Sequence, residues 1–546
     1  MSVDRVLALR AQILERNAAL TRAQQAPAPT APAEGKPASF ADTFQDAFKS
    51  VNQAQAQAGA LSEAYERGET IDIAKVMLAR QQASVGFEAT LQVRNKLLSA
   101  YKDIMLNNFT DDYLDGLGCR DFAPRPKVSG RLSSYDGLLM EAVGLALPVG
   151  TVCAVGDGAS RIEAEVIGFR GGKTLMMNLG GPAALLPNAP VRPIGPPGEA
   201  EVGAALLGRV VDGAGKPIDG LGPVRGAGKW PLAGKLQSPL DRGRVLEPLD
   251  VGVRAINGLL TIGQGQRVGI MAGSGVGKSV LLGMIVRAAQ ADVVVVGLIG
   301  ERSREVADFL ETKVFGAART RSVVVAVPAN HSPVLRIRGA LRATAIAESF
   351  RAEGKKVLLI MDSLTRVAHA GREIGLALGE PASARGYPPS AIAMLPGLIE
   401  RAGTCVSSGG SITAIYTVLA DGDDGNDPVV DSARSILDGH IVLSRALAER
   451  GVYPAIDLGP SVSRVMTDIA DKDHIHAARV LRRHLATYEE NRDLVLMGAY
   501  RPGADPEIDA AIACHPAVME YIRQSADEIV TLPDAIAELT GVFGDA

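Results

Sequence analysis

Residues 272–279, AGSGVGKS, lie between an apolar run, RVGIM at 267–271, and the apolar stretch SVLLGMIVRAA at 279–289. A strand that passes through a glycine-rich turn directly into a helix is the start of a βαβ unit in a parallel sheet. The glycines let the backbone curl so that its N–H groups converge, and the helix N-terminus adds partial positive charge there. This stretch predicts a phosphate-binding loop in an α/β domain. The alternative, a chance glycine-rich turn, does not account for the flanking strand and helix.

The residues of this loop predict a nucleotide triphosphate site with a magnesium ion. Lys278 is expected to reach the β- and γ-phosphates, and Ser279 to ligate Mg²⁺. The loop departs from the GxxxxGK[ST] pattern at its first position, which is Ala272. The predicted nucleotide-binding residues are Gly273, Ser274, Gly275, Val276, Gly277, Lys278 and Ser279.

Two further carboxylates follow apolar runs. Asp362 ends VLLIMD at 357–362, where it could hold Mg²⁺ or its water. Glu301 follows GLIG in GLIGERSREV at 297–306, where it could polarise the water that attacks the γ-phosphate, and Arg302 beside it could contact phosphate. The sequence leaves open whether Glu301 and Arg302 act in this way or merely solvate a strand end.

Two residues near the end of this region have no local signature. Arg464, in SVSRV at 461–465, could supply positive charge to the transition state, often a role of an arginine from a neighbouring chain. Tyr453, in GVYPAID, could stack on a base or pack in the core, and from the residues alone the core interpretation is favoured.

Patterns along the chain predict a multidomain protein, since 546 residues exceed one hydrophobic core. Nearly continuous apolar runs predict strands of a mostly parallel sheet with both faces covered: 267–271, 292–299, 322–327, 357–361, 411–419 and 440–443. Short β-rich runs cut by glycine predict a small β-barrel or sandwich before them. The predicted domains are a helical segment at 1–105 with a Pro/Ala linker at 26–38, a connector at 106–126, a β-barrel at 127–197, an α/β core at 198–468 and a helical domain at 469–546.

Composition excludes several classes of protein. The formal net charge of -4 and the aromatic content of 4% argue against a nucleic-acid-binding protein. Scattered charges in the first residues exclude a signal peptide, and no apolar run approaches the ~20 residues of a membrane span. The four cysteines form no CxxC pair and are expected to be reduced core thiols of a cytoplasmic protein: Cys119, Cys153, Cys405 and Cys514.

Residues 126–546 resemble the rotary ATPase family, the α/β-type subunits of ATP synthases and their relatives, and most closely the flagellar type III export ATPases. The matching stretches are LDVGVRAINGLLTIGQGQRVGIMAGSGVGKS (249–279), GLIGERSREV (297–306), MDSLTRVAHAGREI (361–374), ARGYPPS (384–390), ERAG (400–403), DPVVDSARSILDGHIVLSR (427–445) and YPAIDLGPSVSR (453–464).

The resemblance implies roles for single residues and a RecA-like P-loop core. By position, Lys278 and Ser279 match the family's phosphate and magnesium ligands, and Asp362 its second-motif acid. Glu301 matches the catalytic carboxylate, Arg302 a phosphate-contacting arginine, Arg464 the arginine finger and Tyr453 the adenine-stacking tyrosine. ATP and Mg²⁺ are the implied cofactors.

The resemblance also implies partners and a location. Because one chain carries both Glu301 and Arg464, a homohexamer could build every site from identical copies, whereas an α-type synthase subunit would lack the glutamate. The implied partners are the flagellar export gate, regulator and stalk proteins, and export substrates or their chaperones. The implied location is cytoplasmic, peripheral at the inner-membrane export apparatus. The family usually begins with a longer amphipathic helix that binds a regulator and the membrane surface. Here only the short 106–126 stretch is available for that role, unless the upstream helices substitute.

Residues 1–105 resemble a different family, the flagellar hook-basal body protein that joins the rod to the membrane ring. The matching pieces are SFADTFQDAFKSVNQAQ (39–55) and GETIDIAKVMLARQQASVGFEATLQVRNKLLSAYKDIM (68–105). The implied partners of this segment are rod and membrane-ring proteins, and its place is the basal body if it is separated from the rest.

The two resemblances together imply a fusion, and three explanations are open: an adapter segment acting as a docking arm, a chain divided after synthesis, or an artefact of frame reading. The favoured function is ATP hydrolysis coupled to flagellar protein export. The alternatives are a structural basal-body component with a scaffold ATPase half, an ATP synthase β-type subunit and a hexameric helicase.

Overall fold

The computed structural model describes residues 129–544 apart from 182–183, 196–197, 315 and 420–426, with a few single positions earlier in the chain. The chain divides into two compact units, Met1–Arg125 and Pro126–Ala546. The predictions for the N-terminal helices, the linker at 26–38 and the connector at 106–126 lie outside the described residues. All helices and strands whose bounds the structure defines belong to the second unit.

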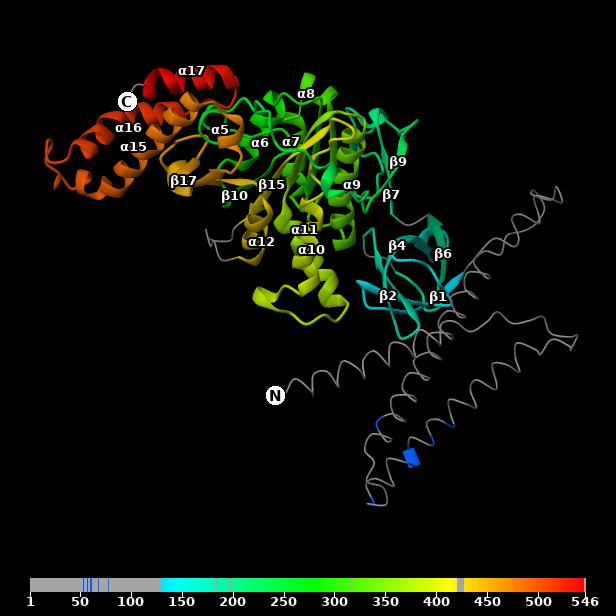
Figure 1. The fold of residues 1–546 in the computed structure, drawn as a ribbon. Coiled ribbons are helices and arrows are strands. Elements are labelled where there is room, and N and C mark those ends of the chain that lie inside the picture. Colours follow the sequence, from blue (N-terminus) through cyan, green and yellow to red (C-terminus); the bar gives the residue numbers. More distant parts are fainter. Residues whose placement is uncertain are drawn as a thin grey trace, which may run out of the picture. The chain divides into compact units, whose positions relative to one another are not determined.

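The first domain of this unit is a closed six-stranded barrel (Figure 1). Each strand pairs antiparallel with two neighbours in the order β1-β2-β5-β4-β3-β6, and β6 pairs back onto β1, so the barrel has no open edge. Alternate side chains, including Met140, Cys153 and Met176, fill its interior. The strands are β1 (Gly130–Tyr135), β2 (Leu139–Val143), β3 (Val152–Val155), β4 (Ile162–Arg170), β5 (Lys173–Asn178) and β6 (Pro190–Gly195).

The second domain is built on a nine-stranded sheet in the order β17-β16-β10-β15-β13-β11-β12-β8, with β14 paired to β15. From β16 to β8 all neighbours run parallel, so their carboxyl ends share one edge of the sheet. The strand β17 runs antiparallel to β16 and ends at the opposite edge. The strands are β8 (Val210–Val211), β10 (Arg267–Ala272), β11 (Val293–Ile299), β12 (Ser322–Val327), β13 (Lys356–Asp362), β14 (Gly403–Thr404), β15 (Ser411–Leu419), β16 (Gly439–Leu443) and β17 (Ile456–Ser463).

Helices cover both faces of this sheet, which explains why its strands are apolar throughout. Along β11, Val294 and Val296 join the core on one face, while Val293 and Val295 join the core on the other. The helices of this domain are α5 (Arg254–Leu259), α6 (Lys278–Ala288), α7 (Ser303–Thr312), α8 (Ala317–Thr320), α9 (Pro333–Ala352), α10 (Leu364–Ala377), α11 (Pro389–Ile399), α12 (Pro428–Ile436), α13 (Arg445–Glu449) and α14 (Met466–Ile469).

Between the barrel and the sheet the chain forms a small antiparallel pair, β7 (Glu199–Val202) and β9 (Gly228–Pro231). Single turns of 3₁₀-helix occur at Gly158–Ser160, Ala204–Leu206, Pro239–Asp241 and Ala384–Gly386. The barrel is tied to α9 by a buried ion pair, in which Arg338 Nη1 lies 2.8 Å from Glu165 Oε2.

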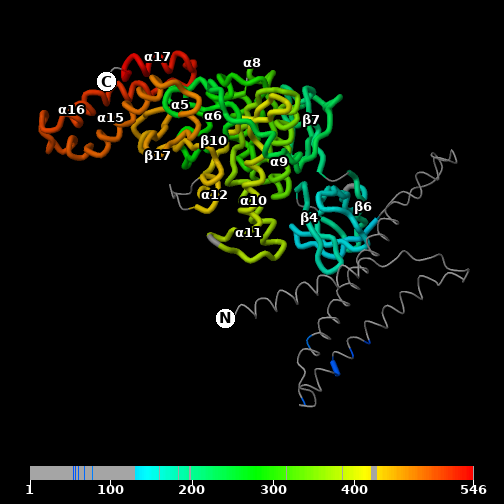
Figure 2. The backbone as a smooth tube through the Cα atoms, in the orientation of Figure 1, coloured from blue at the N-terminus to red at the C-terminus, as the bar shows by residue number. Residues whose placement is uncertain are grey.

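Three helices complete the chain (Figure 2). They are α15 (Lys472–Leu496), α16 (Pro506–Ile522) and α17 (Leu532–Phe543), and α17 packs on α5 at the end of the α/β domain. Asp471, Asp505 and Thr531 cap their N-termini by accepting backbone N–H groups. The predicted fold class, a barrel followed by an α/β P-loop core and C-terminal helices, is confirmed for the described residues.

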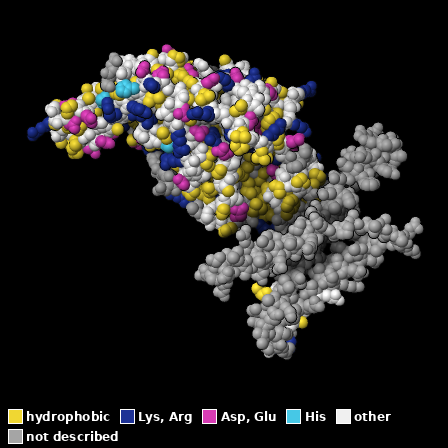
Figure 3. Space-filling view, in the orientation of Figure 1, with side chains coloured by type: hydrophobic (Ala, Val, Ile, Leu, Met, Phe, Trp, Pro, Cys, Tyr) yellow, Lys and Arg dark blue, Asp and Glu magenta, His cyan; other side chains and the backbone are white. Residues whose placement is uncertain are grey.

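On the face seen in Figure 3, basic and acidic side chains are interspersed, without a large field of one sign. No helix in the described part of the chain is long and apolar enough to span a membrane. The prediction that the cysteines are core thiols holds for Cys153, which is buried and free, with a pKa that burial raises to about 11. Cys514 is free and half-buried, and it packs against the main core from α16. The prediction is wrong for Cys405, which is free but half-buried in a loop. Cys119 lies outside the described residues.

Candidate active site

The glycine-rich loop joins β10 to α6 as predicted, in the middle of the sheet between β15 and β16. Gly275 and Gly277 adopt positive φ angles of 80° and 88°, which L-residues with side chains rarely adopt. Val276 is buried in the core and anchors the loop to it, while Ser274 and Gly275 are exposed. The first N–H groups of α6 have no partner within their own helix. The loop is therefore shaped to present backbone donors to an anion.

Lys278, the first residue of α6, joins the two predicted carboxylates into one cluster. Its Nζ lies 2.5 Å from Asp362 Oδ1 and 3.3 Å from Glu301 Oε1. The carboxylates come from the carboxyl ends of β13 and β11, which are neighbouring parallel strands. Glu301 is 9% exposed and Asp362 3% exposed, so water screens these charges weakly. The sequence motifs thus converge at one edge of the sheet.

Burial and charge act on this cluster in opposite directions. Burial disfavours the ammonium of Lys278, but the charges of Asp362 and Glu301 outweigh that effect and raise the pKa of Lys278 above its ordinary value. Burial raises the pKa of the Asp362 carboxyl, while Lys278 and the hydroxyl of Thr417 oppose the rise. Lys278 therefore stays a cation at neutral pH and is held beside the loop.

Two neighbours of this cluster were not predicted from the sequence. Thr417 of β15 is fully buried, and its Oγ1 donates a hydrogen bond of 2.5 Å to Asp362 Oδ1. Arg366 of α10 lays its side-chain stem against Gly300, where an added Cβ would come within 2.6 Å of Arg366 Cβ. Thr417 sits within an apolar run, so only the strand register reveals it. Arg366 lies four residues after Asp362, and no signal beyond that spacing points to it.

Two predicted residues do not join the cluster. The Arg302 side chain is 85% exposed and lies 3.4 Å from Glu305. Arg464 follows β17, whose last residue, Ser463, stands opposite Gly439 at the start of β16. Its backbone N–H donates to the carbonyl of Asp438 at 3.0 Å. Arg464 therefore lies at the edge of the sheet opposite its own loop. The 6 residues of β10 separate these two edges by about 20 Å, at ~3.3 Å per residue.

Tyr453 lies against the loop. A Cβ added to Gly277 would sit 3.4 Å from Cδ1 and Cε1 of the Tyr453 ring. Tyr453 is 46% exposed, so its interpretation as a core residue is wrong. The carbonyl of Tyr453 accepts a hydrogen bond of 2.9 Å from the backbone N–H of Gln524, which ties it to the C-terminal domain. An exposed aromatic face next to a phosphate loop is suited to stacking on a base.

The donor set fits a magnesium nucleotide. The hydroxyl of Ser279 is exposed at the start of α6, and the carboxylate of Asp362 stands at the strand end beside Lys278. Hydroxyl and carboxylate oxygens are the ligands that Mg²⁺ takes when phosphates supply the rest. Ser279 and Asp362 would hold the ion and the loop the phosphates.

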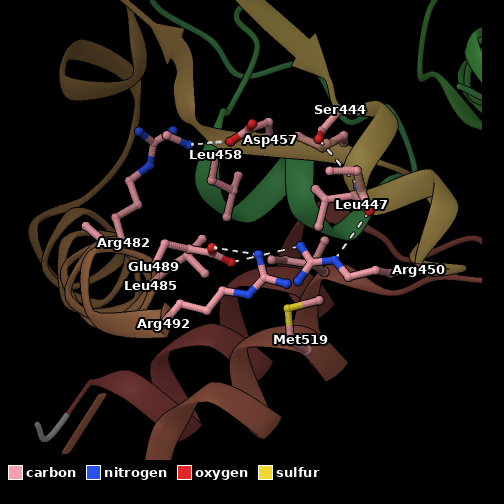
Figure 4. A pocket seen from close by; sticks show the side chains of 15 residues that line it. Ser444, Leu447, Arg450, Asp457, Leu458, Arg482, Leu485, Glu489, Arg492 and Met519 are labelled. Carbon is pink, nitrogen blue, oxygen red and sulfur yellow. Dashed lines mark hydrogen bonds and ion pairs between the residues drawn. The ribbon is translucent and has the colours of Figure 1, made fainter. Parts of the chain in front are cut away.

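A separate cavity of about 460 Å³ lies between β17, α13 and the helices α15 and α16 (Figure 4). Arg450 and Arg492 each place a guanidinium nitrogen 3.9 Å from a carboxylate oxygen of Glu489. Leu447, Leu485 and Met519 line its apolar side. It contains no residue of the loop or of the Lys278 cluster, so it is distinct from the candidate active site.

Family models match three parts of the chain. Residues 252–463 match the nucleotide-binding domain of the ATP synthase alpha/beta family. Residues 470–541 match the C-terminal domain of the type III secretion ATPase EscN. Residues 21–107 match the flagellar hook-basal body complex protein FliE.

Whole proteins of similar sequence and structure are known. The flagellum-specific ATP synthase of Pseudomonas aeruginosa is 50% identical over 423 residues, which span 77% of this chain and 94% of that protein. The structure of the assembled ATPase EscN from the enteropathogenic E. coli type III secretion system matches with a TM-score of 0.72 and 41% identity, over 76% of this chain and all of that one. EscN in complex with its central stalk EscO matches with a TM-score of 0.70 and 40% identity, over the same shares of the two chains.

Proposed function

Because the chain belongs to the flagellar and type III secretion ATPases of the ATP synthase alpha/beta family, with a FliE-type segment fused before them, we propose that it hydrolyses ATP to drive flagellar protein export. The observation that carries the chemistry is the cluster at the carboxyl edge of the sheet. There Lys278 bridges Asp362 and Glu301 directly beside a phosphate-binding loop.

Each residue of the cluster has a task in this mechanism. The loop N–H groups and Lys278 hold the β- and γ-phosphates, and Tyr453 receives the adenine. Glu301 accepts a hydrogen bond from the attacking water and aligns it with the γ-phosphorus. Ser279 and Asp362 would hold Mg²⁺, which would neutralise charge on the terminal phosphates. Arg302, exposed immediately before α7, contacts phosphate in this proposal.

The test of this proposal is Glu301→Gln. The amide keeps the shape but is a far weaker acceptor for the water proton, so hydrolysis should fall by at least ~100-fold while nucleotide still binds. ATP turnover and the binding of a fluorescent ADP analogue measure the two effects. Glu311→Gln, an exposed glutamate near the other end of the same helix α7, is the matched control and should hydrolyse ATP normally. A Glu301→Gln protein with native turnover would exclude this role.

We further propose that the active assembly is a homohexamer in which Arg464 completes the site of the next copy. Arg464 lies at the edge opposite its own loop, so it cannot reach the phosphates that its own chain binds. A ring of identical chains brings that edge against the loop edge of a neighbour. An arginine supplied in this way spreads the charge of the transition state.

Mixing two inactive variants tests this arrangement. Arg464→Ala and Glu301→Gln should each be inactive alone, while co-assembled subunits should recover part of the activity. In mixed rings some interfaces join an intact Glu301 from one variant to an intact Arg464 from the other. No recovery in rings shown by mass to be mixed would contradict the shared site.

The remaining partners follow from the family. EscN forms a complex with its central stalk EscO, and we propose that a stalk or regulator protein, the export gate, and export substrates or chaperones engage this chain. The proposed location is the cytoplasmic face of the inner-membrane export apparatus, with peripheral membrane contact. For the FliE-type segment the proposed partners are rod and membrane-ring proteins.

We propose that the fused segment remains attached and serves as a docking arm. Blotting whole cells with antibodies to each half, followed by mass spectrometry, tests this. A single species near 56.9 kDa supports the docking arm. Two smaller species that divide near residue 105 would mean two separate flagellar proteins instead.

A further inference from the structure

Thr417 is the one side chain of β15 that forms a hydrogen bond with the Lys278 cluster within the described residues. The register that pairs Met361 of β13 with Tyr416 of β15 makes Asp362 and Thr417 neighbours at the carboxyl edge of the sheet. Parallel neighbours in register direct their side chains to the same face. The strand pairing therefore places the Thr417 hydroxyl beside the Asp362 carboxylate.

The direction of this hydrogen bond follows from its geometry. Thr417 Oγ1 lies 2.5 Å from Asp362 Oδ1 and 3.4 Å from the carbonyl oxygen of Met361. A hydroxyl has one proton to donate, and the shorter bond to an ionised carboxylate is the stronger of the two. Thr417 therefore donates to Asp362.

Two donors consequently converge on one oxygen of Asp362. Lys278 Nζ and Thr417 Oγ1 both lie 2.5 Å from Oδ1, one from the loop side and one from the adjacent strand. Together they fix the rotation of the carboxylate about its Cβ–Cγ bond. By contrast, the side chain of Glu301 has a single contact of 3.3 Å to Lys278 among the described residues.

We propose that Thr417 is a positioning residue: by holding Oδ1, it turns the other oxygen of Asp362 toward the magnesium nucleotide. Without the hydroxyl, Lys278 alone contacts the carboxylate, which is then able to rotate and to offer either oxygen to the ammonium. Thr417 acts through Asp362, since its side chain is fully buried. This inference rests on the proposed function.

The test is Thr417→Val, which removes the hydroxyl and keeps a β-branched side chain of similar shape. Groups that orient a metal-ligating carboxylate typically change metal affinity or activity by 10–100-fold when they are removed. We expect the gain in affinity for a fluorescent ADP analogue on adding Mg²⁺ to fall by ~10-fold or more, with a matching fall in kcat. Affinity in EDTA should be unchanged, because the loop and Lys278 remain.

Three further variants separate orientation from packing. Thr417→Ser keeps the hydroxyl and should retain most of the magnesium effect, while Thr417→Ala should resemble Thr417→Val and replaces it if the valine variant does not fold. Thr344→Val is the matched control. Thr344 is also fully buried, but its hydroxyl bonds only the carbonyl of Ala340 in its own helix, so this variant should behave as wild type.

Three results would overturn the inference: an unchanged magnesium effect in Thr417→Val, an equal loss in Thr417→Ser, or an equal loss of affinity in EDTA. Each leaves the proposed function intact as long as the wild-type chain hydrolyses ATP with Mg²⁺. A wild-type chain that does not hydrolyse ATP would instead remove the proposed function itself.

Discussion

Two clusters of three charged side chains in this molecule have opposite signs of charge. One has a cation between two carboxylates, and the other has a carboxylate between two cations. Beside the phosphate loop, Lys278 lies between the carboxylates of Glu301 and Asp362, at 3.3 and 2.5 Å. In the cavity of Figure 4, the carboxylate of Glu489 lies between two arginines, each at 3.9 Å. The side chains of the first cluster are 4–11% exposed and those of the second 36–41%.

The difference shows why similar charge patterns have different consequences. Water and salt screen an exposed pair at 3.9 Å, so each such contact contributes little. A buried cluster is screened weakly, so each charge there depends on its partners and acts strongly on any ligand that enters. Only the first cluster also stands at the carboxyl ends of parallel strands, where α/β proteins bind their ligands.

Lys278→Met should have the largest effect. It leaves two buried carboxylates facing each other without a cation. Breaking a buried pair in this way typically lowers the free energy of unfolding by ~3–5 kcal/mol, and we expect about 3 kcal/mol here since Asp362 can take up a proton. ATP hydrolysis should fall by at least ~100-fold because the γ-phosphate loses a fixed positive charge. Urea unfolding of the nucleotide-free protein and ATP turnover measure both effects.

Lys216→Met is the matched control for that substitution. Lys216 Nζ also lies close to a carboxylate, at 2.8 Å from Glu163, but the two side chains are 63% and 35% exposed. Its loss should change the free energy of unfolding by less than ~1 kcal/mol. Equal destabilisation by the two substitutions would show that burial does not distinguish these pairs.

The fold was largely predictable because the central strands are buried on both faces. Their apolar runs identified β10, β11, β12, β13, β15 and β16. The strands β8, β14 and β17 of this sheet were not predicted. β8 and β14 have two residues each, too few for a sequence pattern, and are defined by their pairing with β12 and β15. β17 is an edge strand that contains Gly459 and Pro460, residues that disfavour a central strand.

The candidate site was predictable where chemistry and strand ends coincide in the sequence. Glu301 and Asp362 come at the ends of apolar runs and Lys278 ends the glycine-rich loop, and the parallel pairing of their strands brings them together. The reversal of β17, which carries Arg464 to the far edge, depends on tertiary pairing that no local pattern records. The exposure of Tyr453 also depends on tertiary structure, since its position beside the loop is not recorded in any local pattern. The catalytic and binding roles of these residues stay predictions.

Asp457, in the wall of the Figure 4 cavity, should give a smaller and pH-dependent effect. Burial raises the pKa of this carboxyl from its ordinary value of 3.8, the Gly459 N–H opposes the rise, and Glu489 adds to it. A raised pKa means that the folded protein binds this proton more tightly than the unfolded chain does. The stability that it contributes is present below pH 3.8 and is lost as the pH rises through the folded value.

Comparing wild type with Asp457→Asn over acidic to neutral pH measures that effect. The asparagine oxygen can still accept the Gly459 N–H, which Asp457 Oδ1 accepts at 3.1 Å. The wild type should therefore lose free energy of unfolding relative to the variant as the pH rises from about 4 to 7. A difference that stays constant over this range would show that the cavity does not penalise the charge.

Glu489→Gln should have the smallest effect. It tests whether the exposed cluster around Glu489 contributes little to stability. The substitution leaves Arg450 and Arg492 without their shared carboxylate, yet both remain more than a third exposed and can be solvated. We expect the free energy of unfolding to fall by less than ~1 kcal/mol, the loss to shrink in high salt, and ATP turnover to stay unchanged. Urea midpoints at low and high salt measure it. A salt-independent loss of ~3 kcal/mol would mean that this exposed cluster contributes as much to stability as the buried one. Exposure would then not explain why Lys278 and its carboxylates differ from Glu489 and its arginines.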